Sequence, residues 1–173
     1  QYAYKTGERV APLLTSVQAF EDASVSIDDY TFSADESELL LMINQTPIYR
    51  HSFTADYYIW YREGAGSIIP LSDENLGQQR LATFSPAGDK VAFVRDNNVF
   101  VTDGYTETQV TTDGEFNKVI NGATDWVYEE EFGEDNGLFW SPDGQRLAYY
   151  RFDETNVREF SMPVYGELYQ DPY

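Results

Sequence analysis

The segment with the clearest chemical potential is an acidic stretch near residue 130. Six of the eleven residues in 125–135 are aspartate or glutamate, and Glu129, Glu130 and Glu131 are consecutive. No lysine or arginine occurs in residues 119–145. Adjacent carboxylates repel one another unless a cation reaches them from elsewhere. The stretch therefore predicts a site that takes up a positive charge.

Three kinds of cation could occupy such a site: a divalent metal, an arginine from another part of the fold, or the ammonium group of a ligand. Calcium takes about six to eight oxygen ligands, usually from an alternating loop, and residues 129–131 lack that alternation. The chain has no cysteine and a single histidine, His51, so thiolate and zinc sites are disfavoured. We therefore expect no metal and no other cofactor.

A solvated helix face on an acidic protein is another explanation for the same glutamates. Large apolar residues flank them at Trp126, Val127, Tyr128 and Phe132. An idle surface run is not normally embedded in so many large apolar side chains. This neighbourhood favours a binding site over a plain solvated face.

No nucleophile accompanies the acidic stretch. The chain contains no cysteine and no Gly-x-Ser-x-Gly elbow. His51 follows Arg50 in a strand-like segment with no positioned serine nearby, so we expect a structural or exposed histidine. The sequence predicts no catalytic residue in this chain and a binding role for the glutamates.

The composition excludes some partners and favours an all-β fold. Thirty acidic and eleven basic residues give a formal net charge of −19, which repels phosphate backbones, so no nucleic-acid partner is expected. The longest apolar run, residues 39–43, is too short to span a bilayer, so no membrane span is expected. Aromatic residues make up 16% of the chain and alternate with β-branched and polar residues, as in half-buried strands.

Three segments repeat one pattern, in which an aromatic residue and a serine precede a tight turn and a short apolar strand. Their aromatic residues are Phe32, Phe84 and Trp140, at spacings of 52 and 56 positions. This spacing is typical of the four-stranded blades of a β-propeller. The predicted repeats are residues 20–62, 68–112 and 113–165. Because propellers use about four to eight blades, we expect a partial β-propeller of about three blades, a fragment of a longer protein.

Two further elements can be placed within these repeats. Residues 96–98 predict a hairpin turn between two apolar strands of the middle repeat. Residues 121–133 break the strand pattern: Thr124 or Asp125 can cap a helix of one or two turns, and Gly133 can end it. The glutamates are therefore expected on a short acidic helical insertion.

The same residues carry a resemblance to a known family. Residues 121–131, NGATDWVYEEE, closely resemble the double-glutamate motif of the dipeptidyl peptidase IV family. Residues 50–55, RHSFTA, resemble the family's arginine-containing segment, and residues 140–155 resemble the strand after the motif. The resemblance implies an eight-bladed propeller joined to an α/β-hydrolase domain with a Ser-Asp-His triad, and that domain is absent from this chain.

The resemblance also implies roles for individual residues. Glu130 and Glu131 are similar to the pair that binds the α-ammonium group of the substrate. Arg50 resembles the arginine that contacts the carbonyl of the substrate's second residue and braces the acidic site. The supporting residues are Glu129, Trp126 and Tyr128.

The function expected from this resemblance is the propeller portion of a serine-type dipeptidyl aminopeptidase. Its substrate is a peptide with a free amino terminus and Pro or Ala at the second position, released as an X-Pro or X-Ala dipeptide. A prolyl tripeptidyl peptidase and a non-catalytic interaction propeller stay open as alternatives. The expected partners are the substrate, the protein's own α/β-hydrolase domain and a homodimer partner. The absence of cysteine favours a bacterial periplasmic, cell-surface or secreted protein.

Overall fold

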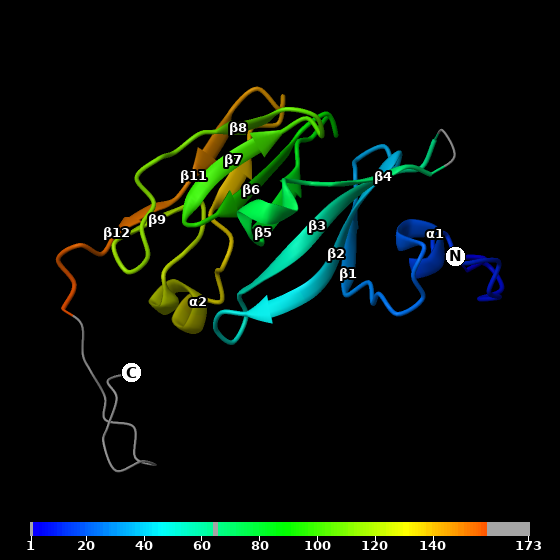
Figure 1. The fold of residues 1–173 in the computed structure, drawn as a ribbon, viewed down its shortest axis with the longest axis horizontal. Helices are drawn as coiled ribbons and strands as arrows, with labels where there is room; N and C mark the ends of the chain where they lie inside the picture. Colours follow the sequence, from blue (N-terminus) through cyan, green and yellow to red (C-terminus); the bar gives the residue numbers. More distant parts are fainter. Residues whose placement is uncertain (1, 64–65, 159–173) are drawn as a thin grey trace, which may run out of the picture.

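The computed structural model describes residues 2–63 and 66–158, and these residues are mostly β-sheet with a few short helices (Figure 1). The expectation of a chain dominated by strands is therefore confirmed. The helices of this part are α1 (Ser16–Phe20), the 3-10 helix η1 (Glu74–Leu76) and α2 (Trp126–Phe132). None of the described helices is long and apolar enough to cross a membrane.

Two four-stranded antiparallel sheets make up the first two thirds of the fold, and each follows the chain as a meander. The strands of the first sheet are β1 (Asp29–Phe32), β2 (Glu38–Pro47), β3 (Phe53–Tyr61) and β4 (Ile68–Pro70). The strands of the second sheet are β5 (Arg80–Phe84), β6 (Val91–Arg95), β7 (Asn98–Thr102) and β8 (Glu107–Gln109). Residues 68–70, which the repeat spacing places in the second repeat, pair with β3 and so belong to the first sheet.

The last described part of the fold forms two short ladders. Strand β9 (Val119–Asn121) pairs with β12 (Arg151–Asp153), and β10 (Leu138–Trp140) pairs with β11 (Leu147–Tyr149). Tyr150 joins the ladders, because its N–H donates to the Gly137 carbonyl at 2.9 Å and its carbonyl accepts from the Gly122 N–H at 2.8 Å. Helix α2 lies in the segment that connects β9 to β10.

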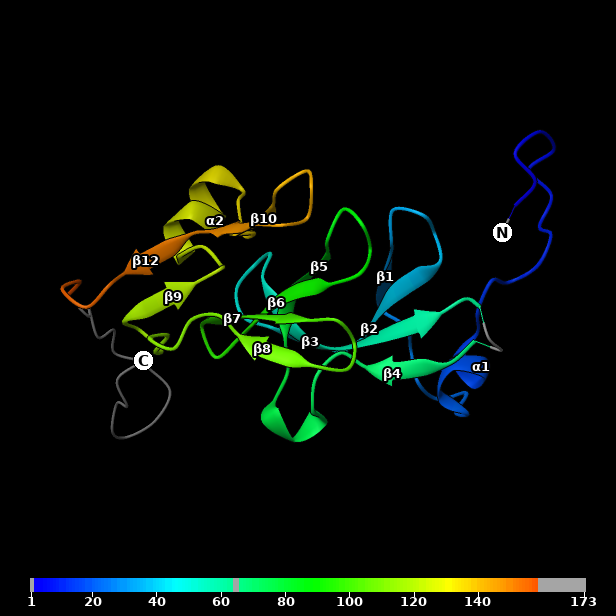
Figure 2. The same ribbon diagram turned by 90° about the horizontal axis from the view of Figure 1, so that it is seen from above.

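Successive sheets pack face to face through separate apolar cores (Figures 1 and 2). Strand β2 is buried on both faces: Leu40 and Met42 meet the second sheet, whereas Leu39 and Leu41 meet α1 and its flanking segment. The opposite face of the second sheet packs against Leu138 of β10. Burial on both faces explains why the apolar run in β2 is continuous rather than alternating.

The repeated turn uses the same hydrogen bonds in all three copies. Its serine hydroxyl donates to a nearby aspartate carboxylate and accepts from the N–H of the first residue of the next strand or of the residue just before it; these serines are Ser33, Ser85 and Ser141. The residue three positions after the serine has a left-handed backbone: Glu36 (φ 60°), Gly88 (φ 79°) and Gly144 (φ 66°). Glycine adopts this conformation without strain, whereas glutamate does not.

The hairpin predicted at residues 96–98 is confirmed. Arg95 and Asn98 are paired across β6 and β7, so Asp96 and Asn97 form a two-residue loop. Both loop residues have positive φ, at 48° and 58°. This is the backbone that a type I′ turn requires, and Asn and Asp tolerate it best among residues with a side chain.

The three turns generate a paired stability prediction. Glu36→Gly relieves the left-handed strain in the first copy and should raise the free energy of unfolding by about 0.5–1 kcal/mol. Gly144→Ala should lower it by about 1 kcal/mol, since a Cβ there meets only Pro86 Cδ at 3.7 Å and Ser85 Cβ at 3.9 Å and so adds no clash. Urea denaturation of each variant checks both signs. A destabilising Glu36→Gly would show that strain at this position is not the controlling effect.

Candidate functional site

Helix α2 is defined by local capping at both ends. The Asp125 carboxylate accepts a hydrogen bond from the Tyr128 N–H at 2.9 Å, and Gly133 ends the helix with φ 68°. Thr124, the other predicted cap, instead donates its hydroxyl to the Glu134 carbonyl at 2.6 Å. These contacts confirm the predicted short helix and fix the direction in which its glutamates point.

The helix buries a charged residue and exposes its apolar ones. Glu129 is the buried residue of α2, with 2% exposure. The large apolar residues that flank the glutamates, Trp126, Val127, Tyr128 and Phe132, are all exposed. The apolar neighbours thus do not cover the acidic stretch, and the residue that turns inward is the glutamate expected only to support the site.

Glu129 is buried because it binds a distant loop. Its Oε1 accepts hydrogen bonds from the backbone N–H groups of His51 at 2.8 Å and Ser52 at 2.9 Å. Both residues lie in the loop that connects β2 to β3, and this loop lies beside α2 (Figure 1). Hydrogen bonds from N–H groups to a carboxylate are about twice as strong as neutral ones. Glu129 therefore fixes the hairpin against the helix.

The environment of Glu129 keeps its carboxyl group ionised. Burial raises the pKa of Glu129, but hydrogen bonds from Ser52 and His51 and the positive charge of Arg80 more than offset that effect, so the pKa lies below its ordinary value. A buried carboxylate is stable only where hydrogen bonds and a cation replace its lost hydration. The His51 imidazole itself is exposed.

The anchored hairpin brings Arg50 to Glu130. Arg50 Nε lies 3.2 Å from Glu130 Oε2, and the two side chains are 73% and 18% exposed, respectively. Arg50 is thus the cation from another part of the fold that the isolated glutamates require. Glu131 follows on the exposed side of α2, and none of the described residues forms an ion pair with it. The structure thus brings Arg50, Glu129 and Glu130 together, whereas no side-chain hydrogen bond or ion pair joins Glu131 to them among the described residues.

The two aromatic residues proposed as supports lie on other sides of the helix. Tyr128 makes edge-to-face ring contacts with Phe132 and Phe152, with centroid distances of 5.3 Å and 4.9 Å. Trp126 lines an open hollow of about 410 Å³ that also includes Arg80. Within the part of the chain that the structure describes, neither aromatic side chain is hydrogen-bonded to the glutamates.

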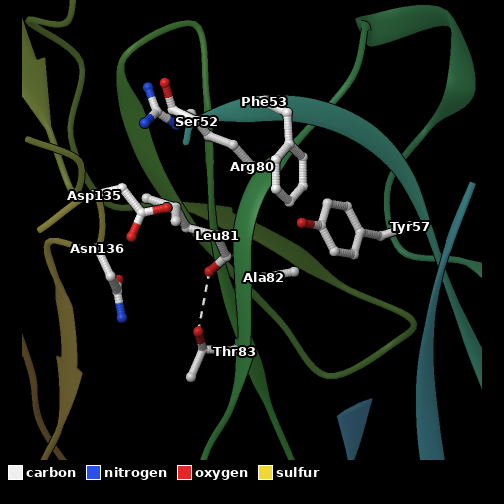
Figure 3. Close-up of a pocket in the computed structure, with 9 residues that line it drawn as sticks. All are labelled: Ser52, Phe53, Tyr57, Arg80, Leu81, Ala82, Thr83, Asp135 and Asn136. Carbon is white, nitrogen blue, oxygen red and sulfur yellow. Dashed lines mark hydrogen bonds between the residues drawn. The ribbon is translucent and has the colours of Figure 1, made fainter. Parts of the chain in front are cut away.

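A smaller pocket lies beneath the hairpin and was not anticipated from the sequence. It has a volume of about 220 Å³, and its polar lining includes Ser52, Arg80, Asp135 and Asn136, with the rings of Phe53 and Tyr57 on another side (Figure 3). Arg80 and Asp135 are far apart in sequence and carry no motif. Among the described residues, no group of three or more His, Asp or Glu side chains could hold a metal ion.

The role of Glu129 can be tested by two substitutions. Glu129→Ala leaves two backbone N–H groups without an acceptor and should lower the free energy of unfolding by about 2–4 kcal/mol. Glu129→Gln keeps an oxygen that can accept both bonds but loses the charge, so its loss should be smaller, about 1 kcal/mol. Glu134→Gln, an exposed neighbour beyond the helix, is the matched control. Equal stability of the alanine variant and the control would remove the anchoring role.

The lowered pKa of Glu129 also predicts a pH effect. Because the folded-state pKa lies below the unfolded-state value, the ionised carboxylate contributes stability above about pH 4.3. That contribution is lost as the pH falls through the folded-state pKa. The difference in unfolding free energy between wild type and Glu129→Gln should therefore shrink on acidification, and urea titrations at several pH values measure it. A difference that stays constant from pH 7 to acid would contradict the assignment.

Comparison with known proteins places this geometry in a family. The family model described as "Dipeptidyl peptidase IV (DPP IV) N-terminal region" matches residues 33–172. Dipeptidyl peptidase 4 of Trichophyton tonsurans is 41% identical over 138 residues, which are 79% of this chain and 18% of that protein. A probable dipeptidyl peptidase 4 of Aspergillus fumigatus is 42% identical over 147 residues, 83% of this chain and 19% of that protein.

A solved structure shows the same fold. The crystal structure of Porphyromonas gingivalis dipeptidyl peptidase 4 matches with a TM-score of 0.87 and 45% sequence identity, covering 99% of this chain and 25% of that one. The chain therefore spans about a fifth to a quarter of the length of the relatives it matches. It follows from the matched residues and from the shared fold that this chain belongs to the dipeptidyl peptidase IV N-terminal region family.

Proposed function

We propose that this chain is part of the propeller of a serine-type dipeptidyl aminopeptidase and that Glu130 and Glu131 bind the substrate's α-ammonium group. The observation that carries the proposal is the Arg50–Glu130 ion pair, held by the buried Glu129 anchor on the hairpin that carries Arg50. Family membership supports the peptidase activity, and the paired acidic side chains support the choice of a cationic group as ligand.

The chemistry of a free amino terminus matches this arrangement. Its pKa is near 8, so it is a cation at neutral pH, with three N–H donors. Arg50 engages one oxygen of Glu130, which leaves the other oxygen and the whole carboxylate of Glu131 as acceptors. Charge-assisted hydrogen bonds to both glutamates neutralise the surplus negative charge. An acetylated terminus has no charge and too few donors, so it is rejected.

Arg50 completes the site on the side of the peptide backbone. Its side chain is 73% exposed while Nε is engaged with Glu130, so its terminal nitrogens are accessible to a ligand. A guanidinium group donates in a rigid planar fork. We assign these donors to the carbonyl of the substrate's second residue.

Holding the amine sets the point of cleavage. A nucleophile at a fixed distance from the glutamates meets only the bond that lies two residues from the terminus. We assign that nucleophile to a Ser-Asp-His triad on an α/β-hydrolase domain outside this chain, and the preference for Pro or Ala to the same domain. The two meandering sheets stacked face to face support blades of a larger propeller, for which we propose eight blades. An extracytoplasmic location and a homodimer stay predictions.

The site assignment predicts a loss of substrate affinity on neutralising either glutamate. In the full-length protein, Glu130→Gln and Glu131→Gln should each lower kcat/KM for a Gly-Pro chromogenic amide by about 30-fold or more. The bound substrate would shield each ammonium–carboxylate pair from water, and removing one member of such a pair costs about 2–5 kcal/mol. Glu134→Gln, equal in charge change, should leave it unchanged. Hydrolysis of the N-acetylated amide should be negligible in every variant. Wild-type kinetics in both glutamine variants would overturn the site.

A separate prediction is that this chain binds the substrate but does not cleave it without the hydrolase domain. Residues 1–173 alone should not hydrolyse the amide, whereas the full-length protein should. Masses of the products from a peptide beginning Xaa-Xaa-Pro distinguish dipeptide from tripeptide release, and the names of the relatives favour the dipeptide. Turnover by the fragment would refute the proposal. A reading frame without a downstream Gly-x-Ser-x-Gly segment would instead favour a non-catalytic interaction propeller.

A further inference from the structure

Arg80 lies at the junction between the two four-stranded sheets. The preceding residue, Gln79, exchanges backbone hydrogen bonds with Ala55 of β3 at 2.8 Å and 2.9 Å. Arg80 itself begins β5 and is paired with Val94 of β6. Its backbone is therefore held by the first sheet on one side and by the second on the other.

An irregular strand puts Arg80 at this position. Thr83 of β5 is paired with Ala92, so a regular ladder would bring Leu81 opposite Val94, but the register shifts by one residue and Arg80 occupies that place. The bulge leaves Leu81 with φ 60°, a conformation that residues with a Cβ rarely adopt. The Thr83 hydroxyl donates to the Leu81 carbonyl at 3.0 Å and helps to hold the bulge (Figure 3). A strained backbone conformation of this kind persists only where the surrounding structure holds the residue in place.

The Arg80 side chain enters an acidic environment and forms no direct ion pair with any residue that the structure describes. It runs along the pocket on the side of Ser52, and Asp135 faces the same pocket (Figure 3). Its Nε is buried and has no hydrogen-bond partner among the described residues. Burial lowers the pKa of Arg80, while the negative charges of Asp135 and Glu129 act in the opposite direction.

Arg80 lines the same pocket as Ser52, whose backbone N–H binds Glu129 (Figure 3). At this position its positive charge acts to lower the pKa of Glu129. Arg50, although close in sequence to the residues that bind Glu129, is largely exposed and pairs with Glu130 instead. Glu129 is therefore served by Arg80, and Glu130 is paired with Arg50. An anionic ligand for Arg80 is disfavoured, because Glu129 and Asp135 already surround it with negative charge.

We propose that Arg80 is a positioning residue for the amine-binding site: its half-buried positive charge holds the Glu129 carboxylate in place and thereby sets the distance between Arg50 and Glu130. The proposal rests on the proposed function for its effect on substrate, but the pairing of Arg80 with Glu129 does not. Without Arg80, the Glu129 anion keeps its two N–H donors but loses its interior counter-charge. It must then take up a proton or move toward water, and the hairpin moves with it.

A double-substitution cycle in the full-length protein tests the pairing without any substrate. Arg80→Met, Glu129→Gln and the double variant are compared with wild type by urea unfolding at neutral pH. Removing one member of an interior charge pair leaves the other uncompensated, so the double variant should lose less stability than the sum of the single variants. Arg62→Met, an exposed arginine at the end of β3, is the matched control and should show no coupling with Glu129→Gln. Additive losses for Arg80 and Glu129 would overturn the pairing.

Kinetics on the same full-length variants tests the positioning role. Arg80→Met should raise KM for the Gly-Pro amide by about tenfold, equivalent to about 1.4 kcal/mol, and leave kcat within about twofold, because the substitution disturbs ground-state binding. Arg80→Lys retains the charge and should restore most of the affinity. A KM for Arg80→Met equal to that of Arg62→Met would overturn the positioning role, even if stability falls.

Failure of the proposed function gives a different pattern. If Glu130→Gln binds and cleaves the amide as wild type does, the amine site is wrong, and the unfolding cycle still decides whether Arg80 and Glu129 are coupled. If Glu130→Gln is impaired while Arg80 and Glu129 act additively, the amine site stands and the positioning role fails. The circular dichroism spectrum of each variant identifies any that do not fold, and Arg80→Gln, which also removes the charge, then replaces Arg80→Met in the cycle.

Discussion

The placement of helix α2, and with it the candidate site, depends on a single buried carboxylate. Glu129 lies on a seven-residue helix and binds two consecutive backbone N–H groups about eighty residues away in the chain. No apolar contact of comparable burial attaches the helix, since its large apolar side chains are exposed. The position of α2 relative to the β2–β3 hairpin is therefore set by directional, charge-assisted bonds rather than by a core, and such bonds define a geometry more narrowly than apolar packing does.

The three adjacent glutamates differ in how their negative charges are offset. Glu129 is compensated internally by N–H groups and the charge of Arg80, so it contributes little net charge to the surface. The negative charge of Glu130 is partly offset by its ion pair with Arg50. Glu131 is exposed and forms no ion pair with the described residues. Under the proposed function, the buried Glu129 has a structural role, whereas Glu130 and Glu131 supply the negative charge that binds a cation.

Features set by neighbours in sequence could be predicted, and those set by distant contacts could not. The repeated serine turns, the loop at Asp96 and Asn97 and the caps of α2 depend on residues within about five positions, and the structure contains them. The inward direction of Glu129 depends on the β2–β3 hairpin, and the placement of Arg80 depends on a register shift between β5 and β6. The grouping of Arg50 with the glutamates was implied only by family resemblance, because no local pattern relates them.

The two ends of the segment that carries α2, residues 122–123 and 136–137, lie in direct contact. Ala123 bridges Asn136, and a Cβ on Gly137 would lie only 2.9 Å from the Gly122 backbone, so the strands approach as closely as glycine permits. Closing a loop whose ends already touch costs little extra as its length changes. Changes in the length of the segment between these residues should therefore leave β9 and β10 in place, whereas the position of α2 itself still depends on the Glu129 anchor.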